Sequence, residues 1–167
     1  RMVMNRFKEL GYRPQLFLLN AADCGVPQRR ERVFFCALRC DIQRPGLILR
    51  PKHRWISAAE ATVGLRDWQK GWRMITASNQ RHTIAGRTKP WPITQPSPTL
   101  VATAQNELID ENKRLHSFSF AEYKRLGSFP DDYHAKTDRI GKYMIGMSVP
   151  PKMTEVVARA VITQWLS

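Results

Sequence analysis

Two apolar runs and the turn between them constrain the fold of this chain more than any other feature. Residues 16–19 (Leu-Phe-Leu-Leu) and 33–38 (Val-Phe-Phe-Cys-Ala-Leu) flank a segment that contains Gly25 and Pro27. We predict strands over 12–20 and 32–38. Because successive residues in both runs are apolar, each strand should be buried on both faces, as strands within a larger sheet are. A hairpin cannot cover its own faces, and no other segment looks like the rest of that sheet. The pattern therefore predicts additional structure from outside this segment of polypeptide.

Capping signals and apolar periodicity predict the remaining elements. We expect an N-terminal helix ending at Gly11, a loop over 41–56, a short helix from the capping box at 57–60 to about Gly64, irregular structure over 66–98, a strand over 99–103, a helix from the capping box at 119–122 to Gly127, and a terminal helix from 150–151 to about Leu166. One face of the terminal helix should be apolar, through Met153, Val157, Ala160, Val161 and Trp165.

The charge balance points to a polyanionic partner. The chain has 27 Lys and Arg against 14 Asp and Glu, a formal net charge of +13, with five tryptophans. A basic surface of this size favours nucleic acid over membrane, and the alternative is a highly charged soluble domain. No apolar run approaches the ~20 residues of a membrane span. Cys24, Cys36 and Cys40 have neither the number nor the spacing of a disulfide framework or a zinc site, and they fit a reducing cytoplasm.

The turn between the two predicted strands carries three side chains with paired N–H donors, Gln28, Arg30 and Arg32. A short turn held by apolar strands at both ends would aim these donors from a rigid sheet edge. Their geometry suits phosphate oxygens and the carbonyl edge of a base. The alternative is a solvated turn in which Arg and Glu form local ion pairs.

Residues 20–32 (Asn-Ala-Ala-Asp-Cys-Gly-Val-Pro-Gln-Arg-Arg-Glu-Arg) resemble the Gln-x-Arg-x-Arg motif of the DNA cytosine-5 methyltransferases. The resemblance implies a loop at the border of the pocket that receives a flipped cytosine. It implies that Arg32 holds the carbonyl edge of the base or a nearby phosphate, that Arg30 braces the phosphate and the active-site loop, and that Gln28 supports both. Cys24 replaces the family's common Tyr or Phe and is not its nucleophile.

Three later segments resemble motifs of the same family in the same order. Residues 95–103 are similar to its Arg-Pro-Ser-Pro-Thr-Ile-x-Ala segment, although a proline-rich linker would also explain them, and 120–133 are similar to its Glu-x-x-Arg-Leu-Gln-x-Phe-Pro-Asp run. Residues 146–151 resemble the final Gly-Asn-Ser-Val-Pro-Pro motif, which closes the S-adenosylmethionine pocket. That likeness implies cofactor contacts from a glycine-bearing loop at Met147, Ser148 and Val149, with Met147 in place of the usual Asn.

The family's earlier motifs do not occur in this sequence. There is no Phe-x-Gly-x-Gly loop, no Glu-Asn-Val segment and no Pro-Cys dipeptide to carry the attacking thiolate. We therefore expect the chain to be inactive alone, because covalent catalysis needs that nucleophile. The resemblance implies an α/β fold, the C-terminal part of a Rossmann-like methyltransferase sheet with a small, mostly irregular target-recognition region. We expect 1–62 and 118–167 to belong to the catalytic domain and 63–117 to the recognition region.

These expectations combine into one leading hypothesis, the C-terminal portion or subunit of a DNA (cytosine-5) methyltransferase. Its partners would be double-stranded DNA and the N-terminal half of the enzyme, and it would be cytoplasmic, near bacterial or phage DNA. Arg reads guanine and Asn or Gln reads adenine in a major groove, so the expected DNA contacts are Arg73, Asn79, Gln80, Arg81, Arg87 and Lys89. The alternatives are a non-catalytic DNA-binding relic and, last, a tRNA methyltransferase of the same fold. The chain lacks the Cys-Phe-Thr segment of that RNA-directed relative.

Overall fold

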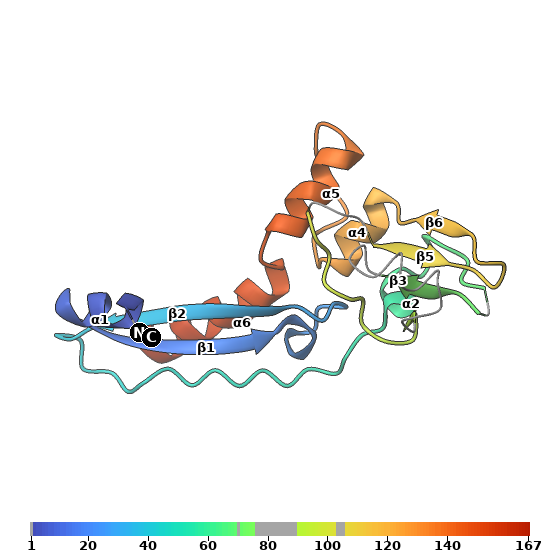
Figure 1. Ribbon diagram of the computed structural model, residues 1–167. Coiled ribbons are helices and arrows are strands. Elements are labelled where there is room, and N and C mark those ends of the chain that lie inside the picture. Colours follow the sequence, from blue (N-terminus) through green and yellow to red (C-terminus); the bar gives the residue numbers. More distant parts are fainter. Residues whose placement is uncertain (1, 70, 76–89, 103–105) are drawn as a thin grey trace.

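The computed structural model describes residues 2–69, 71–75, 90–102 and 106–167 (Figure 1). The molecule is elongated, with a long β-hairpin extending to one side and a lobe of short strands and helices at the other. Both termini lie at the end of the hairpin away from that lobe (Figure 1). Within the described residues, no helix is long and apolar enough to cross a membrane.

The hairpin has the two strands that the apolar runs predict. Helix α1 (Met2–Glu9) leads through Gly11 into β1 (Tyr12–Asn20), and a 3-10 turn (Ala21–Cys24) and a loop connect β1 to β2 (Glu31–Arg39). The strands pair antiparallel along their whole length, from Tyr12 opposite Arg39 to Asn20 opposite Glu31. Gly11 has a φ of 80°, which explains why the chain turns there rather than continuing the helix.

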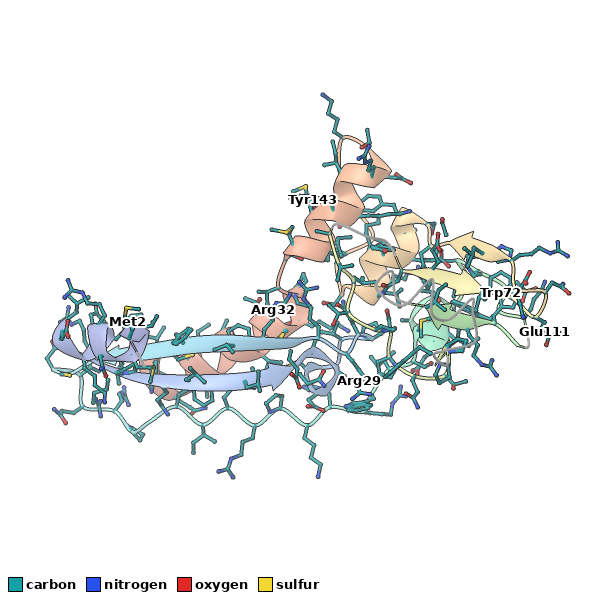
Figure 2. All side chains as sticks on the ribbon, in the orientation of Figure 1. Met2, Arg29, Arg32, Trp72, Glu111 and Tyr143 are labelled. Carbon is teal, nitrogen blue, oxygen red and sulfur yellow. The ribbon has the colours of Figure 1, made fainter. Side chains whose placement is uncertain are left out.

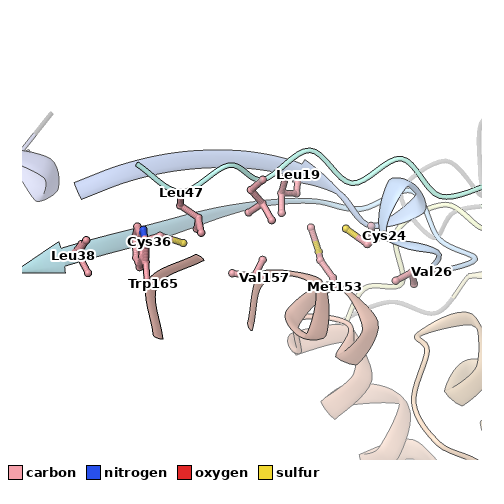
Figure 3. Packing of buried hydrophobic residues seen from close by; sticks show 11 residues of the cluster. Leu19, Cys24, Val26, Cys36, Leu38, Leu47, Met153, Val157 and Trp165 are labelled. Atoms are coloured by element: carbon pink, nitrogen blue, oxygen red, sulfur yellow. The ribbon is translucent and has the colours of Figure 1, made fainter. Parts of the chain in front are cut away.

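One face of the hairpin carries the first hydrophobic core. Helix α6 (Pro151–Val161) and the π-helical segment Ile162–Leu166 pack against this face. Figure 3 shows Leu19, Cys36 and Leu38 of the strands facing the side chains of Met153, Val157 and Trp165, as the apolar periodicity of the terminal helix predicts. The loop over 41–56 runs beside β1 (Figure 1), and the Gln15 amide holds it by accepting from Leu47 N at 2.6 Å and donating to Leu47 O at 3.1 Å.

The opposite face of the hairpin is exposed. Leu16 lies opposite Phe35 and Leu18 opposite Val33, so the four side chains form one apolar patch that is between 44% and 61% exposed. The prediction that both faces are buried is therefore wrong for the described residues. The physical reason is that these residues provide cover, from α6 and 41–56, for one face only.

The second lobe is built on a small antiparallel sheet with the strand order β4-β3-β5-β6. Its strands are β3 (Arg73–Ile75), β4 (Trp91–Pro92), β5 (Glu107–Ile109) and β6 (Leu115–Ser117). The recognition region is thus more regular than the sequence suggests, although each strand is only two or three residues long. The predicted strand at 99–103 is absent over 99–102, and Thr103 lies outside the described residues.

Three helices complete this lobe and its core. Helices α2 (Ala58–Ala61) and α4 (Phe120–Leu126) begin where the capping signals predict, with Ser57 and Ser119 accepting from the backbone N–H groups of Glu60 and Glu122. The predicted glycine-bearing loop is wrong at Gly146 and Met147, because both residues lie in helix α5 (Asp138–Met147). The buried residues of the second core are Ala58, Met74, Leu100, Leu108, Phe118, Tyr123, Leu126 and Ile145. Because they come from all three predicted segments, the domain boundaries at 62 and 117 stay predictions.

Candidate functional site

The loop between β1 and β2 is fixed against the proline-rich segment near residue 97. Gly25 adopts a left-handed φ of 76° at the end of the 3-10 turn, which an L side chain rarely tolerates. Arg29 N donates to Ser97 O at 2.8 Å and Ser97 N donates to Pro27 O at 2.9 Å. These reciprocal bonds form a parallel bridge between Gln28 and Ser97, so the loop is held in one conformation.

Gln28 faces inward and satisfies backbone groups of two other segments. Its side chain is 1% exposed. The amide accepts from Leu100 N at 3.0 Å and donates to Leu126 O, at the end of α4, at 3.3 Å. Gln28 is therefore a brace inside the protein, and the supporting role at the base pocket that the resemblance implies for it stays a prediction.

Arg30 is a second internal brace, and it links the loop to α5. The residue is 2% exposed, and its guanidinium donates to Leu100 O at 2.6 Å and to Gly146 O at 2.8 Å. Burial, with a smaller contribution from the nearby Arg32 charge, lowers the pKa of Arg30 to about 10. At Gly146 the backbone of α5 also packs closely against the backbone of Ala102. Only glycine fits there, because a Cβ atom would lie 2.4 Å from Ala102 N.

Arg32 is the member of the motif whose side chain reaches an open pocket. Its guanidinium donates to Glu31 O at 2.7 Å and is partly exposed. The pocket has a volume of about 400 Å³, and its lining is polar: Asn20, Arg29, Glu31, Arg32 and Thr99. Figure 2 places Arg32 toward the end of the hairpin that is nearer the second lobe. Sequence reasoning did not single out Arg29 or Thr99, and the only available signal was their position within the two motifs.

The predicted cofactor residues lie at the end of α5, one residue beyond the Arg30 contact. Met147 and Val149 are exposed apolar side chains. Ser148 N–H donates to Met144 O and its hydroxyl donates to Ile145 O at 2.9 Å, so this N–H is not directed at a ligand. What remains available is an apolar surface and the lone pairs of the Ser148 hydroxyl.

Of the residues predicted to contact DNA, only Arg73 lies within the described part of the chain. Arg73 begins β3, is exposed, and donates to Trp72 O at 2.9 Å. Trp72 in turn stacks on His116, with ring centroids 4.7 Å apart. The other predicted contacts lie outside the described residues: Asn79, Gln80, Arg81, Arg87 and Lys89.

The fold agrees with comparison to known proteins. A model of the C-5 cytosine-specific DNA methylase family matches residues 1–62 and 47–163. The chain belongs to this family. Among curated relatives of this methylase chain, the type II methyltransferase M.MthTI of Methanothermobacter thermautotrophicus is 22% identical over 96% of the chain and 59% of its own length. M.BspRI of Lysinibacillus sphaericus is 28% identical over 96% of the chain and 46% of its own length.

Solved structures agree with the fold. The DNMT2 mutant of Spodoptera frugiperda superposes with a TM-score of 0.69 at 14% identity, covering 95% of this methylase chain and 60% of that chain. The resemblance read from the sequence and the predicted α/β methyltransferase fold are thereby confirmed. The methylase chain spans about half the length of the curated relatives it matches.

Proposed function

We propose that this chain is the C-terminal portion, as a segment or a subunit, of a DNA (cytosine-5) methyltransferase. The whole enzyme would transfer a methyl group from S-adenosylmethionine to C5 of a flipped cytosine in double-stranded DNA. The observation that carries the proposal is the polar pocket beside Arg32, positioned by the buried braces Gln28 and Arg30. A chain of the C-5 cytosine-specific DNA methylase family with this arrangement is suited to hold a nucleotide taken out of the stack.

Arg32 would contact the flipped nucleotide directly in this proposal. Its planar guanidinium presents two parallel N–H groups, which match a base carbonyl or two phosphate oxygens. Gln28 and Arg30 would act through position, because their polar atoms already bind Leu100, Leu126 and Gly146. Arg30 joins the pocket loop to α5, so a shift of α5 would also displace the neighbouring Arg32.

The nucleophile would come from outside this chain. Burial raises the pKa of Cys24 to about 11 and also raises that of Cys36, so neither thiol is a ready thiolate. Cys40 is exposed, but its N–H pairs with Gly11 O near the start of β1, at the end of the hairpin away from the pocket. The N-terminal half would supply the attacking thiolate and the acid that protonates the ring.

Two exposed apolar surfaces support a partner half. One is the hairpin face of Leu16, Leu18, Val33 and Phe35. The other is a stripe on α5, at the helical spacing of one face, that is between 42% and 64% exposed: Ile140, Tyr143, Met144 and Met147. Burying an apolar side chain of this size contributes about 1.5–3 kcal/mol. Contiguous exposed apolar patches mark interaction surfaces, and the N-terminal half of the enzyme is the proposed occupant.

S-adenosylmethionine would lie against the end of α5 and supply the methyl group. Met147 and Val149 would give apolar contact, and the Ser148 hydroxyl would accept a hydrogen bond, which fits the methionine end of the cofactor. The DNA duplex would lie along the recognition lobe, with Arg73, Asn79, Gln80, Arg81, Arg87 and Lys89 as the proposed base or phosphate contacts. The net charge of +13 favours this partner.

A mixing experiment tests the proposal. The chain is combined with the separate N-terminal halves of M.MthTI and M.BspRI, and with an N-terminal half from its own source, and transfer of labelled methyl groups to duplex DNA is measured. Transfer is expected only in a mixture, and Arg32→Ala should abolish it. Arg39→Ala is the matched control, because Arg39 lies at the far end of β2, paired with Asp41. If Arg32→Ala leaves transfer unchanged, the proposed role of the pocket is wrong.

A second candidate function is a DNA-binding module without catalysis. Met147 favours it, because the family's usual Asn is absent and this side chain is exposed. Persistent DNA binding in mixtures that never transfer methyl groups would support this candidate over the enzyme.

A further inference from the structure

Arg29 lies at the junction of the hairpin and the second lobe (Figure 2), and its guanidinium contacts the rings of Trp55 and Trp91. Its guanidinium carbon is 5.5 Å from the ring centroid of Trp55 and 5.1 Å from that of Trp91. Both distances are within the range of favourable cation–π contact. We call this group of three residues the Arg29 clamp.

Each part of the clamp is held by its own hydrogen bonds. Trp55 Nε1 donates to Asp23 Oδ1 at 2.8 Å, and Trp91 Nε1 donates to Pro96 O at 2.9 Å. The backbone of Arg29 is fixed on both sides, because its N–H binds Ser97 O and its carbonyl accepts from Thr99 Oγ1 at 2.8 Å. Hydrogen bonds therefore fix the backbone of Arg29 and both rings that contact its exposed guanidinium.

The polar edge of this guanidinium has no partner in the described part of the chain. No hydrogen bond or ion pair of the Arg29 side chain occurs among these residues, although the residue is exposed. Some other exposed arginines have carboxylate partners, as in Arg39–Asp41, Arg54–Glu60 and Arg159–Glu155. Stacking uses the faces of the guanidinium and leaves its in-plane N–H groups available. The N–H groups of the Arg29 guanidinium are thus oriented by the clamp but form no hydrogen bond within the described residues.

The clamp borders the pocket beside Arg32. Arg29 and Arg32 line it with Asn20 and Thr99, and Glu31 is the one acidic residue of the lining. Two guanidinium groups against one carboxylate favour an anion of small size. A tetrahedral phosphate offers several acceptor oxygens to such a pair.

We propose that the Arg29 clamp binds a phosphate group of the nucleic-acid backbone, adjacent to the nucleotide that Arg32 contacts. This inference rests on the proposed function, since it assumes that a nucleic-acid strand enters the pocket. An unrestrained Arg loses rotamer freedom when binding immobilises it. The tryptophans hold the side chain before binding, so this loss does not weaken the complex.

Salt-dependent DNA binding by the 167-residue chain tests the inference. The probe is a short fluorescein-labelled duplex, and its affinity is measured by anisotropy at several salt concentrations. Arg29→Gln keeps much of the packing against both rings and removes the charge. It should lower affinity about tenfold at low salt. It should also reduce the slope of log affinity against log salt by about 1, the effect of one lost phosphate contact.

Two further variants separate binding from packing. Arg29→Lys keeps the charge but not the fork, so affinity should fall while the salt slope stays within error of wild type. Trp55→Leu loosens the clamp without removing charge, and it should act in the same way. Arg54→Gln is the control, because Arg54 is the neighbour of Trp55, is exposed, and is paired with Glu60. Its affinity and slope should remain those of wild type.

The outcomes distinguish this inference from the function on which it rests. If the wild-type chain does not bind the duplex at low salt, either alone or mixed with an N-terminal half, both are overturned. If the wild type binds and Arg29→Gln shows the same affinity and slope, only the inference fails, and Arg29 merely covers the two rings. Arg29-dependent binding of inorganic phosphate, with unchanged duplex affinity, would also overturn it, because the ligand would then be a free anion.

Discussion

Arg30 should contribute more to the stability of this chain than any other residue of the pocket loop. Arg30→Met keeps an apolar stem and removes two charge-assisted hydrogen bonds, to Leu100 O and Gly146 O. Each buried carbonyl left without a partner costs about 1–3 kcal/mol. Removing the charge returns part of this, because burial disfavours the guanidinium, as its lowered pKa indicates. The expected loss is about 2–4 kcal/mol, a large fraction of the roughly 5–15 kcal/mol of a typical domain.

Urea unfolding followed by tryptophan fluorescence measures this loss. With a slope of about 2 kcal/mol per molar, the midpoint of Arg30→Met should fall by about 1–2 M. The urea midpoint of Arg30→Lys should lie between those of wild type and Arg30→Met, because one ammonium group does not reproduce the paired N–H groups that reach two carbonyls. Arg32→Met is the control and should stay within about 0.5 kcal/mol of wild type, since Arg32 is partly exposed and bonds to its neighbour's carbonyl. Equal stability of Arg30→Met and Arg32→Met would refute the proposal that the Arg30 hydrogen bonds stabilise the fold.

Two further predictions concern buried titratable groups. At pH 8 a thiol reagent should modify Cys40 at once and Cys24 only after unfolding, because burial raises the pKa of Cys24 from 9.0 to about 11. The unfolded state loses this proton first, so stability should fall between pH 9 and 11, and a flat profile there would contradict the assignment. Glu122 is buried, which raises the pKa of its carboxyl, but hydrogen bonds from Arg66 and Ser119 outweigh this and lower it below 4.5. Glu122 therefore stabilises the fold above pH 4.5 and loses that effect as the pH falls through its folded pKa. Glu122→Gln should cost about 3–5 kcal/mol at pH 7 and less in acid, and a pH-independent cost would count against the ion pair.

The amino-acid sequence was sufficient for elements whose signals are local. The apolar runs and the turn residues predicted β1 and β2 to within about one residue. Ser119 and Glu122 form the capping box that the sequence indicates, with Gly127 at the helix end. The ordered motifs also determined the family, because each is a short contiguous string.

The predicted strand at 99–103 failed for a reason that only the tertiary structure reveals. Leu100 is fully buried, yet no neighbouring strand satisfies its backbone. Gln28 accepts from its N–H and Arg30 donates to its carbonyl. A buried backbone requires partners, but these partners are side chains from about seventy positions away in the sequence. No local pattern carries that information.

Helix α5 was missed for a related reason. Its apolar stripe, which includes Tyr143 and Met144, faces away from the core, while Gly141 and Gly146 lie on the buried side. Glycines usually indicate a loop, but here they permit close contact with Phe120 and with the backbone of Ala102. The sequence by itself therefore determined the hairpin, the capped helices and the family. The tertiary structure decided that Gln28 and Arg30 turn inward while Arg29 and Arg32 line the pocket, because the groups that bind each side chain are brought together only by folding.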